Sequence, residues 1–124
     1  MKKTVTIKQT DEYREELVKS NLNDILAALG GLESIVSPGD RVLIKVNLLM
    51  GKAPEEAVTT HPLLVKELTK MIQKIGGNVV IADSPAGPFN KMSLKRAYSA
   101  AGLKEVAEET GAELNYNTED KKVD

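Results

Sequence analysis

Apolar positions recur along the chain with two different periods, which predicts strands separated by helices. Two short stretches, residues 42–46 and 78–82, are almost continuously apolar, and polar residues follow each of them. Such runs are typical of buried strands in a sheet that is covered on both faces. Residues 112–116 are predicted to form a last strand. Residues 4–8 alternate β-branched and polar side chains, which predicts a first strand at the edge of the sheet.

Helical spacing of leucine, valine and isoleucine fills the intervals between these stretches. Residues 11–29 are predicted to form the first helix, with Asp11 as its amino-terminal cap. Residues 61–75 repeat the pattern, and two shorter helices are expected over residues 93–101 and 103–110. Strands that alternate with helices predict an α/β fold built from βαβ units. We expect a mostly parallel sheet of about four strands, with helices on both faces.

The 124 residues are enough for one domain with a single core, and residues 117–124 are expected to be a flexible polar tail. The chain has 17 basic and 18 acidic residues, so no basic excess indicates binding to nucleic acid. No apolar stretch approaches the roughly 20 residues that cross a bilayer, and no signal peptide is recognisable. We therefore expect a cytoplasmic protein that is not inserted in a membrane.

The absence of cysteine excludes several kinds of site within this chain: a disulfide framework, a thiolate nucleophile and a thiolate-bound iron–sulfur cluster. A single histidine also excludes a metal site made of several histidines. Any metal would need oxygen ligands. We expect this chain to hold no cofactor or metal by itself.

Polar residues follow the two central strands where each of them ends. Lys45 and Asn47 lie at the end of the first, and Asp83 and Ser84 follow the second, with Gly87 in the same loop. Ligands bind at the carboxyl ends of strands in open α/β sheets, so we expect these residues on one rim that binds a small anion. Lys45 would then attract the anion and Asp83 would orient it. The alternatives are a lysine that snorkels and side chains that only satisfy turns.

The loop of residues 48–60 is long for a connection from a strand to a helix, which suggests function or mobility. It leads into His61, the one side chain whose unperturbed pKa lies near neutrality, and His61 is our candidate proton carrier. Thr59 and Thr60, with the amides of the helix that follows, would bind an anion through backbone donors. The alternative is that His61 or Thr60 merely caps this helix.

Three stretches, residues 39–48, 57–62 and 81–85, resemble in the same order the domain-of-unknown-function family numbered 362. Residues 102–107 are also similar to that family. Its members are often described as iron–sulfur-associated. Where the family commonly has lysine-proline-asparagine, this chain has Lys45-Val46-Asn47, which changes the stiffness of the backbone and keeps the polar pair.

Family members tend to be longer, and many carry a cysteine-rich segment that this chain lacks. The resemblance therefore implies that the chain is the amino-terminal part of a longer protein, and that any iron–sulfur cluster belongs to a segment missing here. The expected partners are a small anion and either the missing carboxyl-terminal region or a redox partner, with an exposed sheet edge available for oligomers. The predicted function is anion binding in an uncharacterised iron–sulfur-associated enzyme. Three alternatives stay open: a scaffolding domain that docks a redox partner, a purely structural half, and, by analogy alone, half of a lactate racemase-like isomerase.

Overall fold

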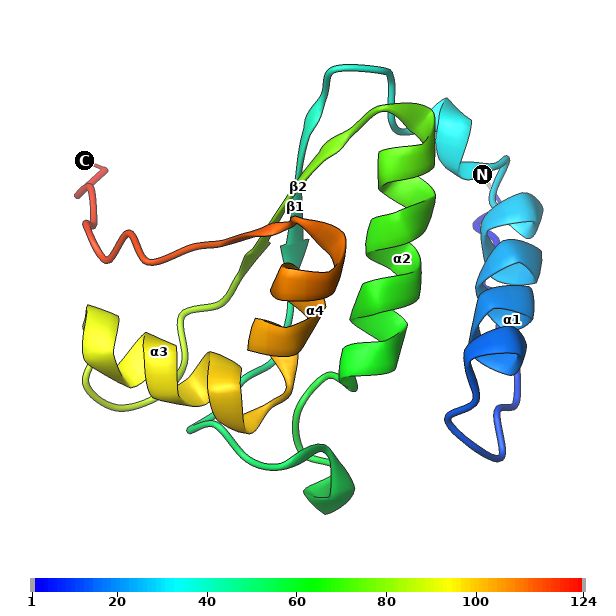
Figure 1. The fold of residues 1–124 in the computed structure, drawn as a ribbon. Coiled ribbons are helices and arrows are strands. Elements are labelled where there is room, and N and C mark those ends of the chain that lie inside the picture. The colour runs from blue at the N-terminus through cyan, green and yellow to red at the C-terminus, as the bar shows by residue number, and fades with distance from the viewer. Residues whose placement is uncertain (1, 124) are drawn as a thin grey trace.

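The computed structural model of the chain describes residues 2–123 (Figure 1). In chain order its helices are α1 (Glu15–Ala28), α2 (Pro62–Ile75), α3 (Lys91–Ala100) and α4 (Leu103–Thr110). The strands are β1 (Arg41–Lys45), β2 (Asn78–Ala82) and β3 (Glu113–Leu114). Two single-turn 3₁₀ helices, η1 (Leu32–Ser34) and η2 (Pro54–Glu56), lie in the connecting loops.

The three strands form one parallel sheet in the order β1-β2-β3. The register places Val42 beside Val79 and Ile44 beside Ile81, and all four pack in or against the hydrophobic core. The predicted α/β class and parallel pairing are confirmed. The sheet has three strands, however, where about four were expected.

The strand predicted over residues 4–8 is wrong. This segment pairs with no other strand, and Val5 and Ile7 are 82% and 87% exposed. The end of the segment lies against α1, where Lys8 Nζ pairs with Asp24 Oδ2 at 2.7 Å. Alternation of β-branched residues gives only a local preference, and a strand also needs a neighbour to pair with and a surface to bury.

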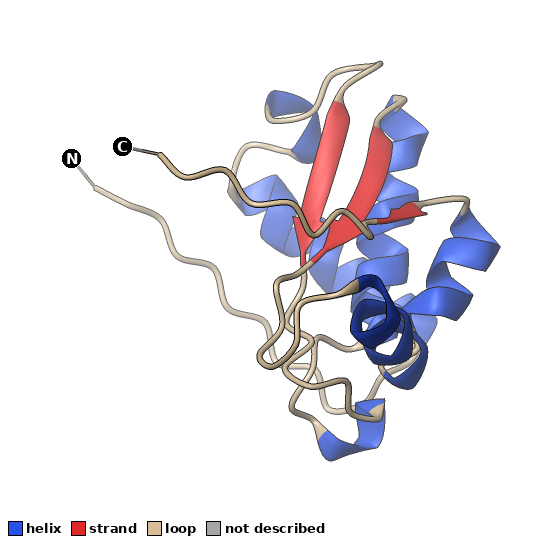
Figure 2. Cartoon of the chain, turned by 90° about the vertical axis from the view of Figure 1, so that its left-hand side faces the viewer, coloured by secondary structure: helices blue, strands red, loops and turns tan. Residues whose placement is uncertain are grey.

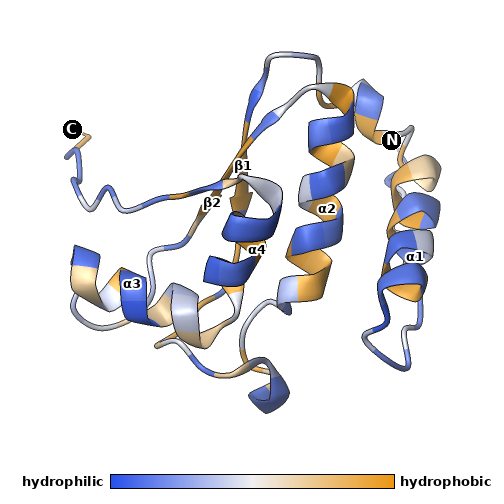
Figure 3. Ribbon diagram, viewed as in Figure 1, coloured by the Kyte–Doolittle hydropathy of each residue, from blue (hydrophilic) through white to orange (hydrophobic). Residues whose placement is uncertain are grey.

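Helices cover one face of the sheet. α2 packs on β2, α4 packs on β3 and on α2, and α1 packs on the side of α2 that is turned away from the sheet (Figures 1 and 2). Leu43, on the opposite face of β1, is 60% exposed. The expectation of helices on both faces is therefore met on one face only within residues 2–123. Apolar residues are accordingly concentrated along β1, β2 and α2 (Figure 3).

The helix ends are set by local chemistry. His61 caps α2, and Gly76 ends it in the left-handed conformation at φ 102°. The predicted cap of the first helix is wrong: α1 begins at Glu15, and no side chain caps it. Asp11 instead accepts a hydrogen bond from Gln9 Nε2 at 2.7 Å. None of the helices in residues 2–123 has the length and apolar character needed to cross a bilayer.

Candidate functional site

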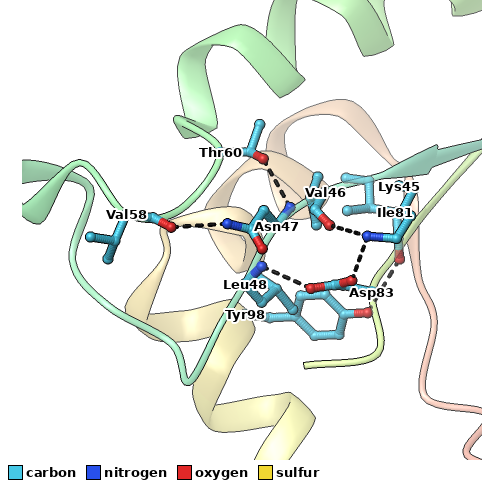
Figure 4. Close-up of polar contacts among 9 residues, drawn as sticks. All are labelled: Lys45, Val46, Asn47, Leu48, Val58, Thr60, Ile81, Asp83 and Tyr98. Atoms are coloured by element: carbon cyan, nitrogen blue, oxygen red, sulfur yellow. Dashed lines mark hydrogen bonds and ion pairs between the residues drawn. The ribbon is translucent and has the colours of Figure 1, made fainter. Parts of the chain in front are cut away.

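Lys45 and Asp83 meet at the carboxyl ends of β1 and β2 (Figure 4). The strand register pairs Lys45 with Ala82, so the residue that follows β2 lies beside the last residue of β1. Lys45 Nζ lies 2.9 Å from Asp83 Oδ1 and donates a second hydrogen bond to Val46 O at 3.3 Å. The Lys45 side chain is 70% exposed and the Asp83 side chain only 6%. The pair therefore holds a surface ammonium over a buried carboxylate.

The Asp83 carboxylate also ties down the loop after β1. Leu48 N–H donates to Asp83 Oδ2 at 2.8 Å. Burial by itself would raise the pKa of Asp83, but the Leu48 amide, the Lys45 ammonium and the Ser84 amide outweigh it and lower the pKa below its usual value. Asp83 is therefore ionised at neutral pH and accepts hydrogen bonds from two donors, Lys45 Nζ and Leu48 N–H, an arrangement that suits a structural anchor better than a proton acceptor.

Asn47 and Thr60 close the long loop at its base. Asn47 N–H donates to Thr60 Oγ1 at 2.9 Å, and Thr60 N–H donates to Asn47 O at 3.0 Å (Figure 4). Asn47 Nδ2 also donates to Val58 O at 3.1 Å. The amide group of Asn47 and the hydroxyl group of Thr60 thus hold the two ends of residues 48–60 together.

His61 is built into the start of α2. Its Nδ1 accepts a hydrogen bond from Leu63 N–H at 3.2 Å, and its ring stacks on Tyr13 with centroids 3.5 Å apart. Burial lowers the pKa of His61, against a weaker opposing effect of the Glu55 carboxylate. Because Nδ1 serves as the acceptor of the cap, the imidazole is neutral and offers only its Nε2–H as a donor. Within residues 2–123 His61 forms no hydrogen bond or ion pair with Lys45 or Asp83.

The first turn of α2 offers no free backbone donor to an anion. Pro62 has no N–H, Leu63 N–H bonds to His61 Nδ1, and Leu64 N–H bonds to His61 O at 3.1 Å. The predicted contribution of helix-end amides beside Thr59 and Thr60 therefore has no geometric support. Thr59 Oγ1 is buried without a hydrogen-bond partner among the described residues.

Ser84 and Gly87 lie in the exposed loop after β2. Gly87 has a φ of 95°, and a Cβ atom added to it would meet no atom within 4 Å. Gly87 therefore allows the left-handed backbone conformation of this turn, and no other group packs closely against it. Of the predicted site residues, the structure brings together Lys45 with Asp83 and Asn47 with Thr60. It places His61 and Gly87 in local roles.

Comparison with known proteins agrees with the residue pattern. Residues 42–124 match the model of the family described as "Domain of unknown function (DUF362)". The chain belongs to this family. The DUF362 resemblance of the three stretches is therefore confirmed, although the family description names no activity.

A relative of this DUF362 chain is the thylakoid-associated protein sll1697 of Synechocystis sp. It is 37% identical over 86 residues, which make up 69% of this chain and 27% of that protein. The chain thus spans about a quarter of the length of this curated relative. No solved structure matches.

Tyr98 is a residue of this DUF362 domain that sequence reasoning passed over. Its side chain is fully buried, and its hydroxyl lies 2.8 Å from Asn115 O and 3.3 Å from Ile81 O. Burial raises the pKa of Tyr98 to about 12. Its place in an apolar helical stripe marked it as a core residue, but only the fold reveals that its hydroxyl joins β2 to the segment after β3.

The donor set at the strand ends of this DUF362 domain does not fit an iron–sulfur cluster. It consists of an ammonium, amides, hydroxyls and one carboxylate that already accepts two hydrogen bonds, whereas clusters are bound mainly by thiolates. In the part of the chain that the structure describes, no three acidic or histidine side chains are grouped so as to hold a metal ion. We therefore derive no cluster chemistry from these residues.

Proposed function

We propose that this DUF362 chain is a small-anion-binding domain whose anchor is Lys45 at the carboxyl ends of β1 and β2. The observation that carries the proposal is the Lys45 ammonium, which is fixed 2.9 Å from Asp83 while its side chain stays 70% exposed. Asp83 restrains the direction of the lysine, so a ligand does not have to order a free side chain. The ammonium has three donors, and two of them are used by Asp83 and Val46 O.

Binding fits the geometry better than catalysis by this chain alone. Both oxygens of the buried Asp83 carboxylate accept hydrogen bonds, and the Nδ1 atom of His61 accepts the bond that caps α2. The atoms that would accept a proton in general base catalysis are thus already hydrogen-bonded within the domain. The catalytic roles predicted for His61 and Asp83 stay predictions, and they would require these hydrogen bonds to break.

The wider role is an inference from the family resemblance. We propose that the domain serves a longer, iron–sulfur-associated, cytoplasmic protein in which another segment completes the anion site. The share of the relative that this chain spans, 27%, leaves room for such a segment in proteins of the relative's size.

The proposal is tested by titrating the isotope-labelled chain with inorganic phosphate and with a small carboxylate such as lactate, while amide chemical shifts are followed. We expect shifts at the ends of β1 and β2, and Lys45→Met should weaken binding about ten- to a hundredfold, the effect of losing one charged hydrogen bond. Lys74→Met is the matched control, because Lys74 is an exposed lysine near the end of α2. Equal affinity of the two variants would show that Lys45 is not the anchor.

One observation favours a second candidate, a scaffolding domain. The sheet face opposite the helices carries Leu43 at 60% exposure, beside the exposed Arg41 and Lys45 of the same strand. Such a face suits contact with another polypeptide. In this second role the chain would show no chemical-shift change with either anion.

A further inference from the structure

Three neighbouring segments at the carboxyl ends of the strands expose large apolar side chains. Met50 is 75% exposed, Phe89 38% and Met92 64%. The turn of residues 48–51 lies against α3, since a Cβ atom on Gly51 would come within 2.5 Å of Ala97 Cα. Phe89 and Met92 flank the start of α3, so the segments that carry the three residues lie at one end of the molecule (Figure 1).

Folding alone does not account for this arrangement. Leu49, next to Met50, has a φ of 51°, a left-handed conformation that is unfavourable for a residue with a side chain. The turn is closed by Gly51 N–H donating to Leu48 O at 2.8 Å, and it presents Leu49 and Met50 to solvent. A turn that only connected two elements would be expected to carry polar residues or glycine here.

The same end of the molecule is basic. Lys91, Lys95 and Arg96 are exposed on α3, and residues 84–104 contain no aspartate or glutamate. Lys95 and Arg96 form no ion pair within residues 2–123. Met92, Lys95 and Arg96 are three and four positions apart, so they share the solvent side of the helix.

We propose that this end of the molecule, formed by Met50, Phe89, Met92, Lys91, Lys95 and Arg96, docks on a lipid bilayer with anionic headgroups. Apolar side chains from separate turns can enter the interfacial layer while the basic side chains stay at the level of the headgroups. Two cavities of the described chain, of about 650 and 480 Å³, lie elsewhere, between α1 and α2 and at the amino-terminal ends of the strands. The projecting apolar side chains therefore suit a soft, flat partner better than a peptide that needs a groove.

The test is sedimentation of the chain with phosphatidylcholine vesicles prepared with and without phosphatidylglycerol, at low and high salt. We expect binding to the anionic vesicles at low salt, with a large loss at high salt. Lys95→Glu/Arg96→Glu should weaken binding about thirtyfold or more, since each basic residue near such a surface contributes about a factor of five. Met50→Ser/Met92→Ser should also weaken it, at unchanged net charge.

Two matched controls isolate the surface. Lys19→Glu/Lys74→Glu changes the net charge by the same amount at exposed lysines of α1 and α2, and Ile35→Ser removes an apolar side chain that is 66% exposed elsewhere. Both should bind like the unchanged chain, and circular dichroism should show every variant folded. Three results would overturn the proposal: no binding at low salt, equal loss in the controls, or binding to polyglutamate but not to vesicles, which would indicate an acidic protein partner.

Discussion

Asp83 joins the ends of two parallel strands to the loop that follows β1. Because its side chain is 6% exposed, Asp83→Ala would leave the buried Leu48 N–H without an acceptor, and we expect a loss of about 2–3 kcal/mol in the free energy of unfolding. Lys45→Met removes a 70% exposed ammonium and leaves the Asp83 carboxylate its bond from the Leu48 amide, so it should cost less, about 1 kcal/mol. Urea unfolding of both variants measures the difference. Equal losses would mean that the ion pair, and not the amide bonds, supplies the stability.

His61 gives the second prediction at this scale, a dependence of stability on pH. Burial lowers the folded-state pKa of His61, so the unfolded chain takes up a proton first as the pH falls below the ordinary value of 6.5. Stability should therefore be complete above that pH and decrease below it. His61→Asn keeps an acceptor for the cap and does not titrate. The stability of the variant relative to the unchanged chain should therefore increase as the pH falls. Since the chain has one histidine, a parallel pH dependence of the two proteins would contradict the assignment.

The sequence correctly predicted that Lys45 and Asp83 lie together, because both follow parallel strands and such strands end at the same edge of a sheet. It could not show that both oxygens of the Asp83 carboxylate already accept hydrogen bonds. One of the two donors, Leu48 N–H, is a backbone amide, which every residue except proline carries, and its direction depends on the path of the loop. The bond between Asn47 and Thr60 was invisible for the same reason, since it spans 13 positions.

At the scale of elements, α1 is held to α2 partly by charge. Glu67 of α2 is 1% exposed and pairs with Lys70 at 2.8 Å, and Lys70 also reaches Glu15 of α1 at 2.9 Å. Lys70→Met would leave a buried carboxylate without its partner, and we expect a loss of about 2–3 kcal/mol in the free energy of unfolding, below the full cost of breaking a buried pair because water reaches Lys70.

The control for this prediction is Lys66→Met. Lys66 pairs with Glu109 at 2.6 Å, but the Glu109 side chain is 55% exposed, so we expect a loss of less than about 1 kcal/mol in the same urea experiment. Adding Glu67→Leu to Lys70→Met should recover most of the stability, because the buried charge is then gone. A double variant as unstable as Lys70→Met would show that the buried charge is not the cause.

Helical periodicity predicted α2 almost to the residue, since the proline that opens it and the glycine that ends it act locally. The alternating pattern of residues 4–8 wrongly predicted a strand, because strand formation there depends on whether the segment can reach the edge of the sheet. The start of α1 was also missed: Asp11 is a good cap by type, but the helix begins at Glu15, beyond its reach. Sequence rules based on capping residues, proline and glycine thus predicted the helix whose ends depend on those residues. They failed for segments whose structure depends on contacts with distant parts of the chain.

For the whole molecule, the sequence predicted a sheet buried on both faces, whereas in the structure the far face is exposed along β1 at Leu43 and buried along β2 at Val80 and Ala82. The apolar sequence of β1 does not predict which of its residues are exposed. Leu43 is as apolar as Ile44, and only the arrangement of the helices makes Ile44 pack against the core and leaves Leu43 exposed. Nothing in the pattern shows that α1 packs on α2 and leaves Leu43, on the far side of β1, uncovered.

The exposure of Leu43 on the far face of β1 can be tested by matched substitutions on neighbouring strands. Ile81 is fully buried between the sheet and the helices, and Ile81→Ala should cost about 3 kcal/mol in the free energy of unfolding, the usual cost of a core cavity. Leu43→Ala, at 60% exposure, should cost less than about 0.5 kcal/mol. Urea unfolding would measure both. If Leu43→Ala instead costs nearly as much as Ile81→Ala at high protein concentration and little after dilution, the open face is buried against another copy of the chain, and the uncovered sheet is an interface rather than a surface.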